Sequence, residues 1–238
     1  MGISDSIDRL NAYYSRHGFA ATIRRAVVGT NRALFANRMV VLYCDLTELT
    51  PRSTKLSSSL KFQRLRSEHE FDPQDLQEIA SLWNPKQAQR NIAERFEKGA
   101  SLWLIKSAGN LAGYGWTIRG CTIARYYFPL GPDDVQLFDF SVLPKFRGRA
   151  LHWVLTFHIL RALAAEGATR AFADTAEWNR AQLSSFKMTP FRRLGLVRTF
   201  KLPGKMIISW VNGGAPEQTP AAKPAQSEDA KVAVGSHE

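Results

Sequence analysis

Short runs of large apolar and β-branched residues recur along the chain and predict strands. The predicted strands cover residues 39–44, 60–66, 101–105, 111–118, 121–128, 135–142, 170–175, 194–200 and 206–210. The run VQLFDFSV at residues 135–142 is the strongest of them. The turn residues at 107–110 predict a hairpin between the runs on either side.

Helical periodicity and capping residues separate these strand-like runs. Asp72-Pro73 and Asn84-Pro85 each combine a good N-cap with a proline, which the first helical turn tolerates, so a helix is expected after each. Residues 150–165 are almost wholly apolar and predict a buried helix, and residues 179–188 predict a further one. Apolar residues also recur at helical spacing within residues 19–34.

The order of these elements predicts an α/β (α+β layered) fold, with a mixed central sheet flanked by helices and a helical N-terminal appendage. We expect three parts. Residues 1–58 form a basic helical extension with one strand, residues 59–211 form the main domain, and residues 212–238 form a disordered tail rich in Ala, Pro, Gln, Ser and charge.

Charge is the most unusual property of the composition. The formal net charge is +11, and the acidic tail concentrates an even larger positive charge in the rest of the chain. Such an excess favours anionic partners, which are nucleic acid, anionic lipid or a phosphorylated cofactor. Nucleic acid is not expected, because the basic residues are not interleaved with aromatic residues in a recognised motif. The arginines of residues 16–38 leave two readings, a helix on an anionic membrane surface or a helix packed on the domain with a solvated basic face.

The two cysteines and the hydropathy of the chain indicate the cellular compartment in which the protein is expected. Cys44 and Cys121 lie in apolar, strand-like runs and form no metal-binding spacing, so we expect buried, reduced thiols and no metal site. No apolar run is long enough to span a bilayer. We therefore expect a cytoplasmic protein, with a peripheral position at the inner face of the membrane as the alternative.

Residues 138–152 (FDFSVLPKFRGRALH) carry the clearest candidate chemistry. The strongest predicted strand stops at Pro144, a short loop with Arg147, Gly148 and Arg149 follows, and the long apolar helix then begins. The first N–H groups of a helix lack backbone partners and carry the positive end of its dipole, so they bind anions. Glycine lets the loop curve toward a ligand, and the arginines add charge. The alternative is an ordinary strand-to-helix connection with solvated arginines.

This segment resembles motif A of the GNAT superfamily, V-x-P-x-x-R-G-x-G/A-x-G/A, which is matched by Val142, Pro144, Arg147, Gly148 and Ala150. The resemblance implies an acyl-CoA-dependent N-acetyltransferase that uses acetyl-CoA as acyl donor. It implies that main-chain groups of one segment contact the cofactor pyrophosphate and pantetheine. These residues are Phe140, Ser141, Val142, Arg147, Gly148, Arg149, Ala150, Leu151 and His152. His152 stands where the family usually has Gly or Ala, so its ring either crowds the diphosphate or turns away from it.

A second stretch extends the resemblance to about residues 60–210. Trp178-Asn179 and the later segment FRRLGL look like the family's N…Y-x-x-L-G-F signature, which implies that Asn179 contacts the CoA arm. Phe191 stands where many relatives carry the tyrosine that protonates the leaving thiolate. Amine attack on a thioester needs a base, because amines are mostly protonated at neutral pH. We expect Asp139, on the strand that lines the cofactor cleft, to be that base, with Glu177 as second candidate.

Two classes of function follow. The first is an N-acyltransferase that acylates a primary amine on a small molecule. A fainter similarity to bacterial GNAT proteins linked with surface-polysaccharide assembly suggests an amino sugar. The second is a non-catalytic GNAT-like module that binds CoA or an anionic partner at a membrane surface. Phe191 and His152 are the two departures from the motif that favour the second class.

Overall fold

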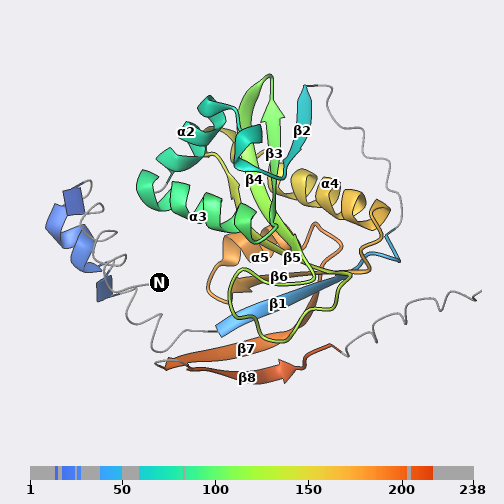
Figure 1. The fold of residues 1–238 in the computed structure, drawn as a ribbon. Coiled ribbons are helices and arrows are strands. Elements are labelled where there is room, and N and C mark those ends of the chain that lie inside the picture. Colours follow the sequence, from blue (N-terminus) through green and yellow to red (C-terminus); the bar gives the residue numbers. More distant parts are fainter. Residues whose placement is uncertain are drawn as a thin grey trace, which may run out of the picture.

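The computed structural model describes residues 14–15, 18–24, 26–27, 38–49, 59–82, 84–202 and 205–216. The described strands form one sheet in the order β2-β3-β4-β5-β6-β1-β7-β8 (Figure 1). Their bounds are β1 Arg38–Asp45, β2 Leu60–Leu65, β3 Ser101–Ser107, β4 Asn110–Arg119, β5 Asp134–Val142, β6 Arg170–Ala176, β7 Arg192–Leu202 and β8 Lys205–Gly213. Among these pairs only β5 and β6 run parallel. The predicted α/β fold with a mixed sheet is confirmed.

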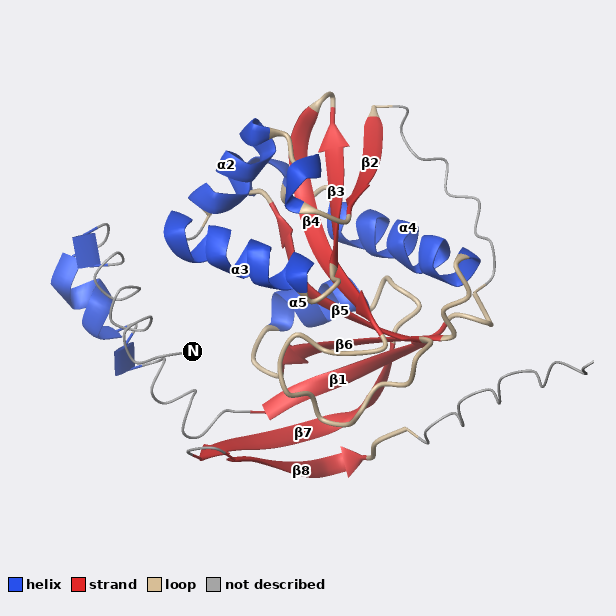
Figure 2. Cartoon of the chain, viewed as in Figure 1, coloured by secondary structure: helices blue, strands red, loops and turns tan. Residues whose placement is uncertain are grey.

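Helices cover both faces of this sheet (Figure 2). Their bounds are α2 Pro73–Ser81, α3 Pro85–Glu97, α4 Leu151–Ala165 and α5 Arg180–Phe186, with the short 3-10 turns η1 Glu68–Glu70 and η2 Pro144–Phe146. Trp116 of β4 contacts Phe96 of α3 on one face, and Trp103 of β3 contacts His158 of α4 on the other. Neighbouring strand residues point to opposite faces, so the two rings mark two separate packing layers.

Local sequence explains where α2 and α3 begin. Asp72 accepts a hydrogen bond from the N–H of Gln74, and Asn84 accepts from the N–H of Lys86, with a proline at the next position in both cases. Each cap satisfies a backbone donor that the first turn would otherwise leave unpaired, which stabilises a helix by about 1 kcal/mol. Both helix starts were expected from the sequence.

Strand β1 occupies a place that the sequence did not predict. Instead of belonging to an extension outside the main domain, it lies in the interior of the sheet, antiparallel to both β6 and β7. Val41 is fully buried, and Val40 and Leu42 are nearly so. The run MVVLYC is apolar on both faces because both faces of this strand are covered. The domain therefore includes residues 38–45.

The predicted strand at residues 121–128 is absent from the described chain, where residues 120–133 form an irregular loop between β4 and β5. β4 and β5 pair directly with each other, which leaves no place between them for a further strand. The loop instead crosses the face of β6 and β1 (Figure 2). Its aromatic residues Tyr126 and Phe128 pack against Val41 and Phe172. Cys121 is exposed, so the prediction of a buried thiol is wrong there, whereas Cys44 is buried as expected.

The N-terminal residues 18–24, 26 and 27 are helical, and Phe19, Ile23 and Val27 are exposed along them. The remainder of the predicted basic segment, up to residue 37, and the tail beyond residue 216 lie outside the described residues. Within the described part of the chain, no helix is both long and apolar enough to cross a membrane.

Candidate functional site

The site forms where β5 and β6 separate. Their parallel pairing runs from Asp134↔Arg170 to Leu137↔Ala173 and then stops. At the next residues β5 makes a bulge against β4, because Asp139 adopts a positive φ of 50° and the register shifts. A bulge adds a residue to one strand and bends it. In the described chain this leaves the β6-facing edge of β5 beyond Leu137 without a strand partner.

The predicted cofactor residues lie together at this end of β5. Phe140, Ser141 and Val142 are on the part of the strand that has no partner on its β6 side, and residues 147–152 form the loop and first turn that open α4. The carbonyl of Val142 accepts a hydrogen bond from Nε of Arg147 at 3.3 Å. One backbone acceptor on the predicted pantetheine edge is therefore already shared with a side chain of the adjoining loop.

The loop before α4 has the properties of an anion site. Gly148 has a φ of 78°, the N-cap residue Ala150 has a φ of 56°, and no side chain caps the first turn of α4. Left-handed residues next to a helix start turn successive N–H groups inward, and uncapped helical N–H groups attract negative charge. Arg147 and Arg149 are exposed beside this loop. The residues present therefore suit the phosphates of a nucleotide cofactor.

His152 does not obstruct this loop. Its ring is packed between Phe140 of β5 and Phe186 of α5, with both centroid distances at 5.4 Å. Neither ring nitrogen has a hydrogen-bond partner among the described residues. Burial lowers the pKa of His152 to about 4, so the imidazole is neutral at physiological pH. The side chain has turned inward, as cofactor binding at the loop requires.

Asp139, the predicted base, is paired with a cation. Its Oδ2 lies 2.5 Å from Nη1 of Arg95 on α3. The two residues line a pocket of about 230 Å³ on the α3 side of the sheet, together with Asn91, Tyr114 and Trp116. The guanidinium of Arg95 also lies 5.1 Å from the centre of the Trp116 ring. The bulge therefore directs Asp139 into a small pocket with one fixed positive charge.

Glu177 and Asn179 follow the end of β6. Glu177 is exposed, and its carboxylate lies 3.6 Å from the guanidinium of Arg38. Asn179 caps α5, since its Oδ1 accepts from the N–H of Gln182 and its amide donates to Oε1 of the same residue. The structure thus gives Glu177 a surface position and gives Asn179 a structural partner on α5. Phe191 is buried against Phe186.

Asp174 of β6 is a carboxylate of this region that the sequence reasoning missed. It is the first β6 residue after the pairing with β5 ends, and the hydroxyl of Tyr127 donates to its Oδ2 at 3.0 Å. Burial raises its pKa, and the Tyr127 hydrogen bond partly offsets that rise. The signal in the sequence is one acid inside the otherwise uncharged, mostly apolar run AFADTA.

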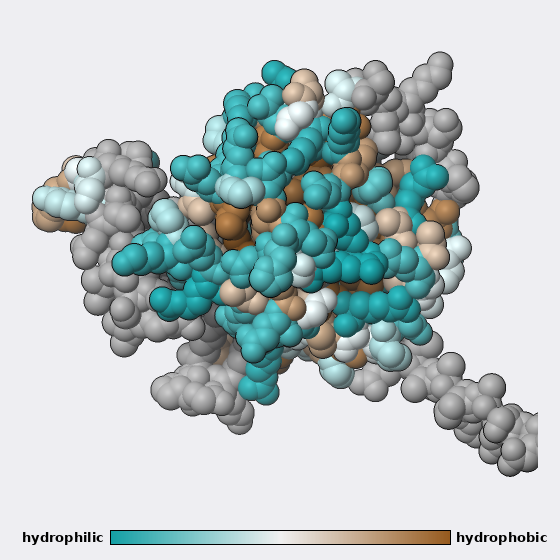
Figure 3. Space-filling view, turned by 45° about the horizontal axis from the view of Figure 1, so that its top comes forward, coloured by the Kyte–Doolittle hydropathy of each residue, from teal (hydrophilic) through white to brown (hydrophobic). Residues whose placement is uncertain are grey.

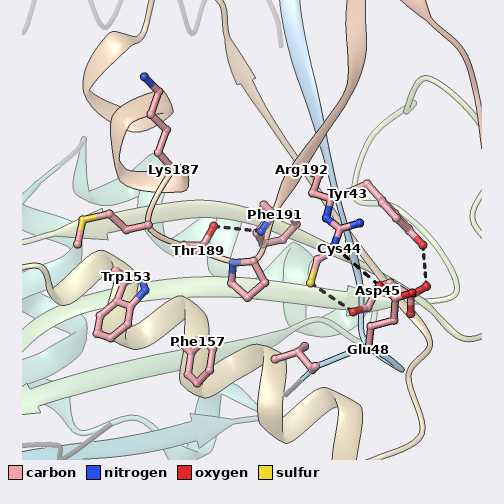
Figure 4. Close-up of a pocket in the computed structure, with 13 residues that line it drawn as sticks. Tyr43, Cys44, Asp45, Glu48, Trp153, Phe157, Lys187, Thr189, Phe191 and Arg192 are labelled. Carbon is pink, nitrogen blue, oxygen red and sulfur yellow. Dashed lines mark hydrogen bonds and ion pairs between the residues drawn. The ribbon is translucent and has the colours of Figure 1, made fainter. Parts of the chain in front are cut away.

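A larger pocket of about 520 Å³ lies elsewhere, at the end of β1 that pairs with the start of β6 (Figure 4). Trp153 and Phe157 of α4 form one wall. The charged residues around it have both signs, with Lys187 and Arg192 against Asp45 and Glu48. It contains none of the predicted site residues. Among the described residues no group of His, Cys, Asp and Glu could hold a metal ion.

Comparison with known proteins agrees with this arrangement. The family model described as "Acetyltransferase (GNAT) family" matches residues 62–188, more than half of the chain. The chain belongs to the GNAT acetyltransferase family. The matched residues include β5, the loop of residues 147–150, α4 and β6, and therefore nearly all of the candidate site described above. No curated protein matches the sequence.

Several solved GNAT structures are similar to this chain at low identity. A GNAT-family acetyltransferase from Novosphingobium aromaticivorans is 15% identical with a TM-score of 0.45, covering 67% of this chain and 61% of its own. A fungal glucosamine N-acetyltransferase region is 12% identical with a TM-score of 0.48, covering 75% and 22%. The ribosomal-protein-S18-alanine N-acetyltransferase from Escherichia coli is 17% identical with a TM-score of 0.39, covering 54% and 74%. This chain spans less than two thirds of the first two.

Proposed function

We propose that this protein is an acyl-CoA-dependent N-acetyltransferase that acylates a primary amine on a small molecule. The observation that carries the proposal is the uncapped start of α4 beside the unpaired edge of β5. The first element can hold the phosphates through backbone N–H groups, and the second can hold an extended arm as a further strand would. When bound there, acetyl-CoA supplies an acyl group activated as a thioester.

The acceptor side of the reaction fits the pocket that Arg95 and Asp139 line. It opens on the α3 face at the β5 bulge, so an amine in it approaches the sheet from the side opposite α4. A volume of about 230 Å³ suits a small head group, and the amide of Asn91 and the charged pair offer hydrogen bonds to hydroxyl groups. We favour an amino sugar as the acceptor because the lining of this pocket combines polar and charged side chains with the aromatic rings of Tyr114 and Trp116.

Binding of acetyl-CoA, measured by isothermal titration calorimetry, tests the phosphate site. The double variant Arg147→Ala/Arg149→Ala should weaken binding by about tenfold or more, because charge-assisted hydrogen bonds contribute about 1.5–3 kcal/mol each when formed. Arg161→Ala is the matched control, since Arg161 is an exposed arginine near the other end of α4. Equal affinity in the double variant and the control, or no heat with the wild type, would refute the proposed site.

Turnover tests the enzymatic part of the proposal. Acetylated products should be detected by mass spectrometry across a panel of amines, including amino sugars and amino acids. Mass detection is preferable to a thiol reagent, because Cys121 is exposed and would react as well. Binding of acetyl-CoA without any acetylated product would favour the non-catalytic class of function.

That second class has one observation in its favour. Phe19, Ile23 and Val27 lie four residues apart on the N-terminal helix and are 68%, 46% and 62% exposed. Figure 3 shows hydrophobic side chains on the outer edge of this segment. Spacing of four places them on one helical face, and the segment also carries Arg24 and Arg25. An apolar face beside basic residues is typical of a helix that lies on an anionic bilayer.

Vesicle flotation tests this membrane contact. The wild type should float with vesicles that contain anionic lipid and should float less with neutral vesicles or at high salt. Replacement of Phe19, Ile23 and Val27 by serine should abolish flotation and leave acetyl-CoA binding unchanged. Equal flotation of the wild type and this variant would refute the contact.

A further inference from the structure

Asp174 differs from the other enclosed carboxylates of the domain in its partner. Asp75 is paired with Lys106 at 2.6 Å, Asp134 with Arg170 at 2.6 Å, and Asp139 with Arg95. A cation compensates the charge of each of these carboxylates. The hydrogen bonds and ion pairs of the described residues give Asp174 no basic partner, and the contact they do give is with a phenol.

The loop over β6 brings two phenols to this carboxylate. Tyr126 and Tyr127 are in ring contact at 4.7 Å, and Tyr127 donates its hydroxyl hydrogen to Asp174. The hydroxyl of Tyr126 is buried and has no partner among the described residues, in a side chain only 9% exposed. A buried unpaired hydroxyl is costly in a purely structural cluster. It is expected where a ligand or a water molecule completes the hydrogen bonds of a site.

The position of Asp174 relates it to the reaction. It follows Ala173, the last β6 residue that pairs with β5, so it flanks the point where the two strands separate. Side chains alternate along β6, and Asp174 shares a face with Phe172, which packs under the loop. Thr175 points to the other face of β6, where its hydroxyl donates a hydrogen bond to Oε1 of Gln182 on α5. Asp174 is therefore on the face away from α5. Asp174 therefore lies on the same face as the bulge pocket of Asp139.

The loop and α3 also meet on this face, which closes one side of it. The ammonium group of Lys98, just beyond α3, donates to the carbonyl of Ile123 at 3.0 Å. Asp174 keeps a partly exposed edge although protein surrounds it on most sides. An acceptor in the pocket beside Asp139 would thus have Asp174 and Tyr127 on the β6 side of the separation.

We propose that Asp174, together with Tyr127, accepts the proton that the acceptor amine loses as it attacks the thioester. This assignment rests on the proposed function. The nitrogen–carbon bond forms, the carbon–sulfur bond breaks, and one proton passes from nitrogen to the Asp174 carboxylate, directly or through the Tyr127 hydroxyl. The thiolate leaves with the electron pair of the broken bond and takes up a proton from Asp174 or from solvent. Asp139 then holds its place in the pocket through Arg95 and is not the base.

Burial supports this role. An enclosed carboxylate without a cation has a raised pKa, which makes it a stronger base than an ordinary aspartate once it is ionised. The groups that face it are Tyr126 and Tyr127 from the loop, with Val41 opposite it on β1. Tyr43 lies two residues beyond Val41 on β1. Asp139 lies on β5, across the gap between β5 and β6, and is paired with Arg95. Among the residues that the structure describes, no ion pair with a cation offsets the effect of burial on Asp174.

The test is the pH dependence of kcat/KM for the best amine of the panel, calculated on the concentration of unprotonated amine, because the free amine would otherwise add an acidic limb of its own. In the wild type kcat/KM should fall at acidic pH as Asp174 becomes protonated. Asp174→Asn should lower kcat/KM by about 10²-fold or more, as loss of a general base does, and should abolish this acidic limb. Acetyl-CoA affinity should remain unchanged, which separates the effect from misfolding.

Tyr127→Phe gives an independent readout. The Tyr127 hydrogen bond lowers the pKa of Asp174, so its removal should move the acidic limb to higher pH while the variant stays active. The matched control is Asp133→Asn, an exposed aspartate of the same loop, which should leave the profile unchanged.

Two failures can be told apart. A wild type that binds no acetyl-CoA, or acetylates no amine, overturns the proposed function and this assignment with it. An active wild type whose acidic limb persists in Asp174→Asn overturns the assignment alone. Loss of the limb in Asp139→Asn instead would give the role to Asp139.

Discussion

The ion pair between Asp134 and Arg170 joins β5 and β6 at the end where the two strands are paired. Its removal is therefore a direct test of how these strands are anchored to each other. Asp134 is the first β5 residue and Arg170 the first β6 residue, and they are opposite each other in the parallel register. Two hydrogen bonds of 2.6 and 2.8 Å join them, and the side chains are 2% and 14% exposed. Asp134 also accepts from the N–H of Gly131 at 2.7 Å.

Asp134→Asn replaces the buried carboxylate by a neutral group of the same shape. Breaking a buried ion pair costs about 3–5 kcal/mol because the remaining charge is uncompensated. We expect a loss near the lower end, about 3 kcal/mol, because the guanidinium of Arg170 keeps some exposure to water. For a domain of this size each kcal/mol lowers Tm by roughly 2–4 °C, so Tm should fall by roughly 6–12 °C.

Asp133→Asn is a close control, because the adjacent Asp133 forms an ion pair with Arg119 in which both side chains are well exposed, at 51% and 39%. Exposed pairs contribute about 0–1 kcal/mol, so this variant should unfold close to the wild type. Urea denaturation and thermal melting measure both variants. Equal stability of the two variants, or a loss below about 1 kcal/mol in Asp134→Asn, would refute the reasoning.

Three further predictions concern single side chains. The His152 imidazole takes up its proton near pH 6.5 in the unfolded chain and near pH 4 in the folded one, so the free energy of unfolding should fall as the pH drops from about 6.5 to about 4. Thermal melts across this range should show a smaller fall for His152→Phe, and parallel curves for the two proteins would contradict this prediction. Burial raises the pKa of Cys44 to about 12, so a thiol reagent should modify Cys121 quickly and Cys44 only after unfolding, and two fast equivalents in the native protein would contradict this. In Gly115→Ala the new Cβ would lie 2.5 Å from the Phe140 ring, whereas carbon atoms in ordinary contact are about 3.5–4.0 Å apart. Urea denaturation should therefore show a free energy of unfolding lower by about 1–3 kcal/mol for this variant. Gly214→Ala is the control and should unfold like the wild type, because the space around Gly214 is open.

Most elements of the fold could be predicted because their signals are local. The caps at Asp72 and Asn84, the apolar helix at residues 151–165 and the strand at 134–142 all follow from residues within a few positions of one another. The signal for the predicted anion site at the start of α4 is local in the same sense, since a strand end, a glycine and a helix start follow one another closely in the chain. Its placement therefore needed no knowledge of distant contacts.

The run at residues 121–128 shows where local signals fail. Its apolar and aromatic residues fit a strand, yet a strand needs an edge to pair with, and β5 already pairs with β4. The same aromatic side chains bury themselves by packing across β6 and β1. Apolar content predicted burial correctly, but the neighbour that provides the burial is set by the whole sheet.

The sequence alone determined the loop at residues 147–150 that resembles motif A, the helices with their caps, and the presence of one large sheet. The tertiary structure decided that β1 lies inside that sheet, that Asp139 is paired with Arg95, and that Tyr127 meets Asp174. The physical reason is the range of the interactions. Capping and periodicity act within a turn or a strand, whereas strand order and the partner of a carboxylate depend on contacts between residues more than forty positions apart.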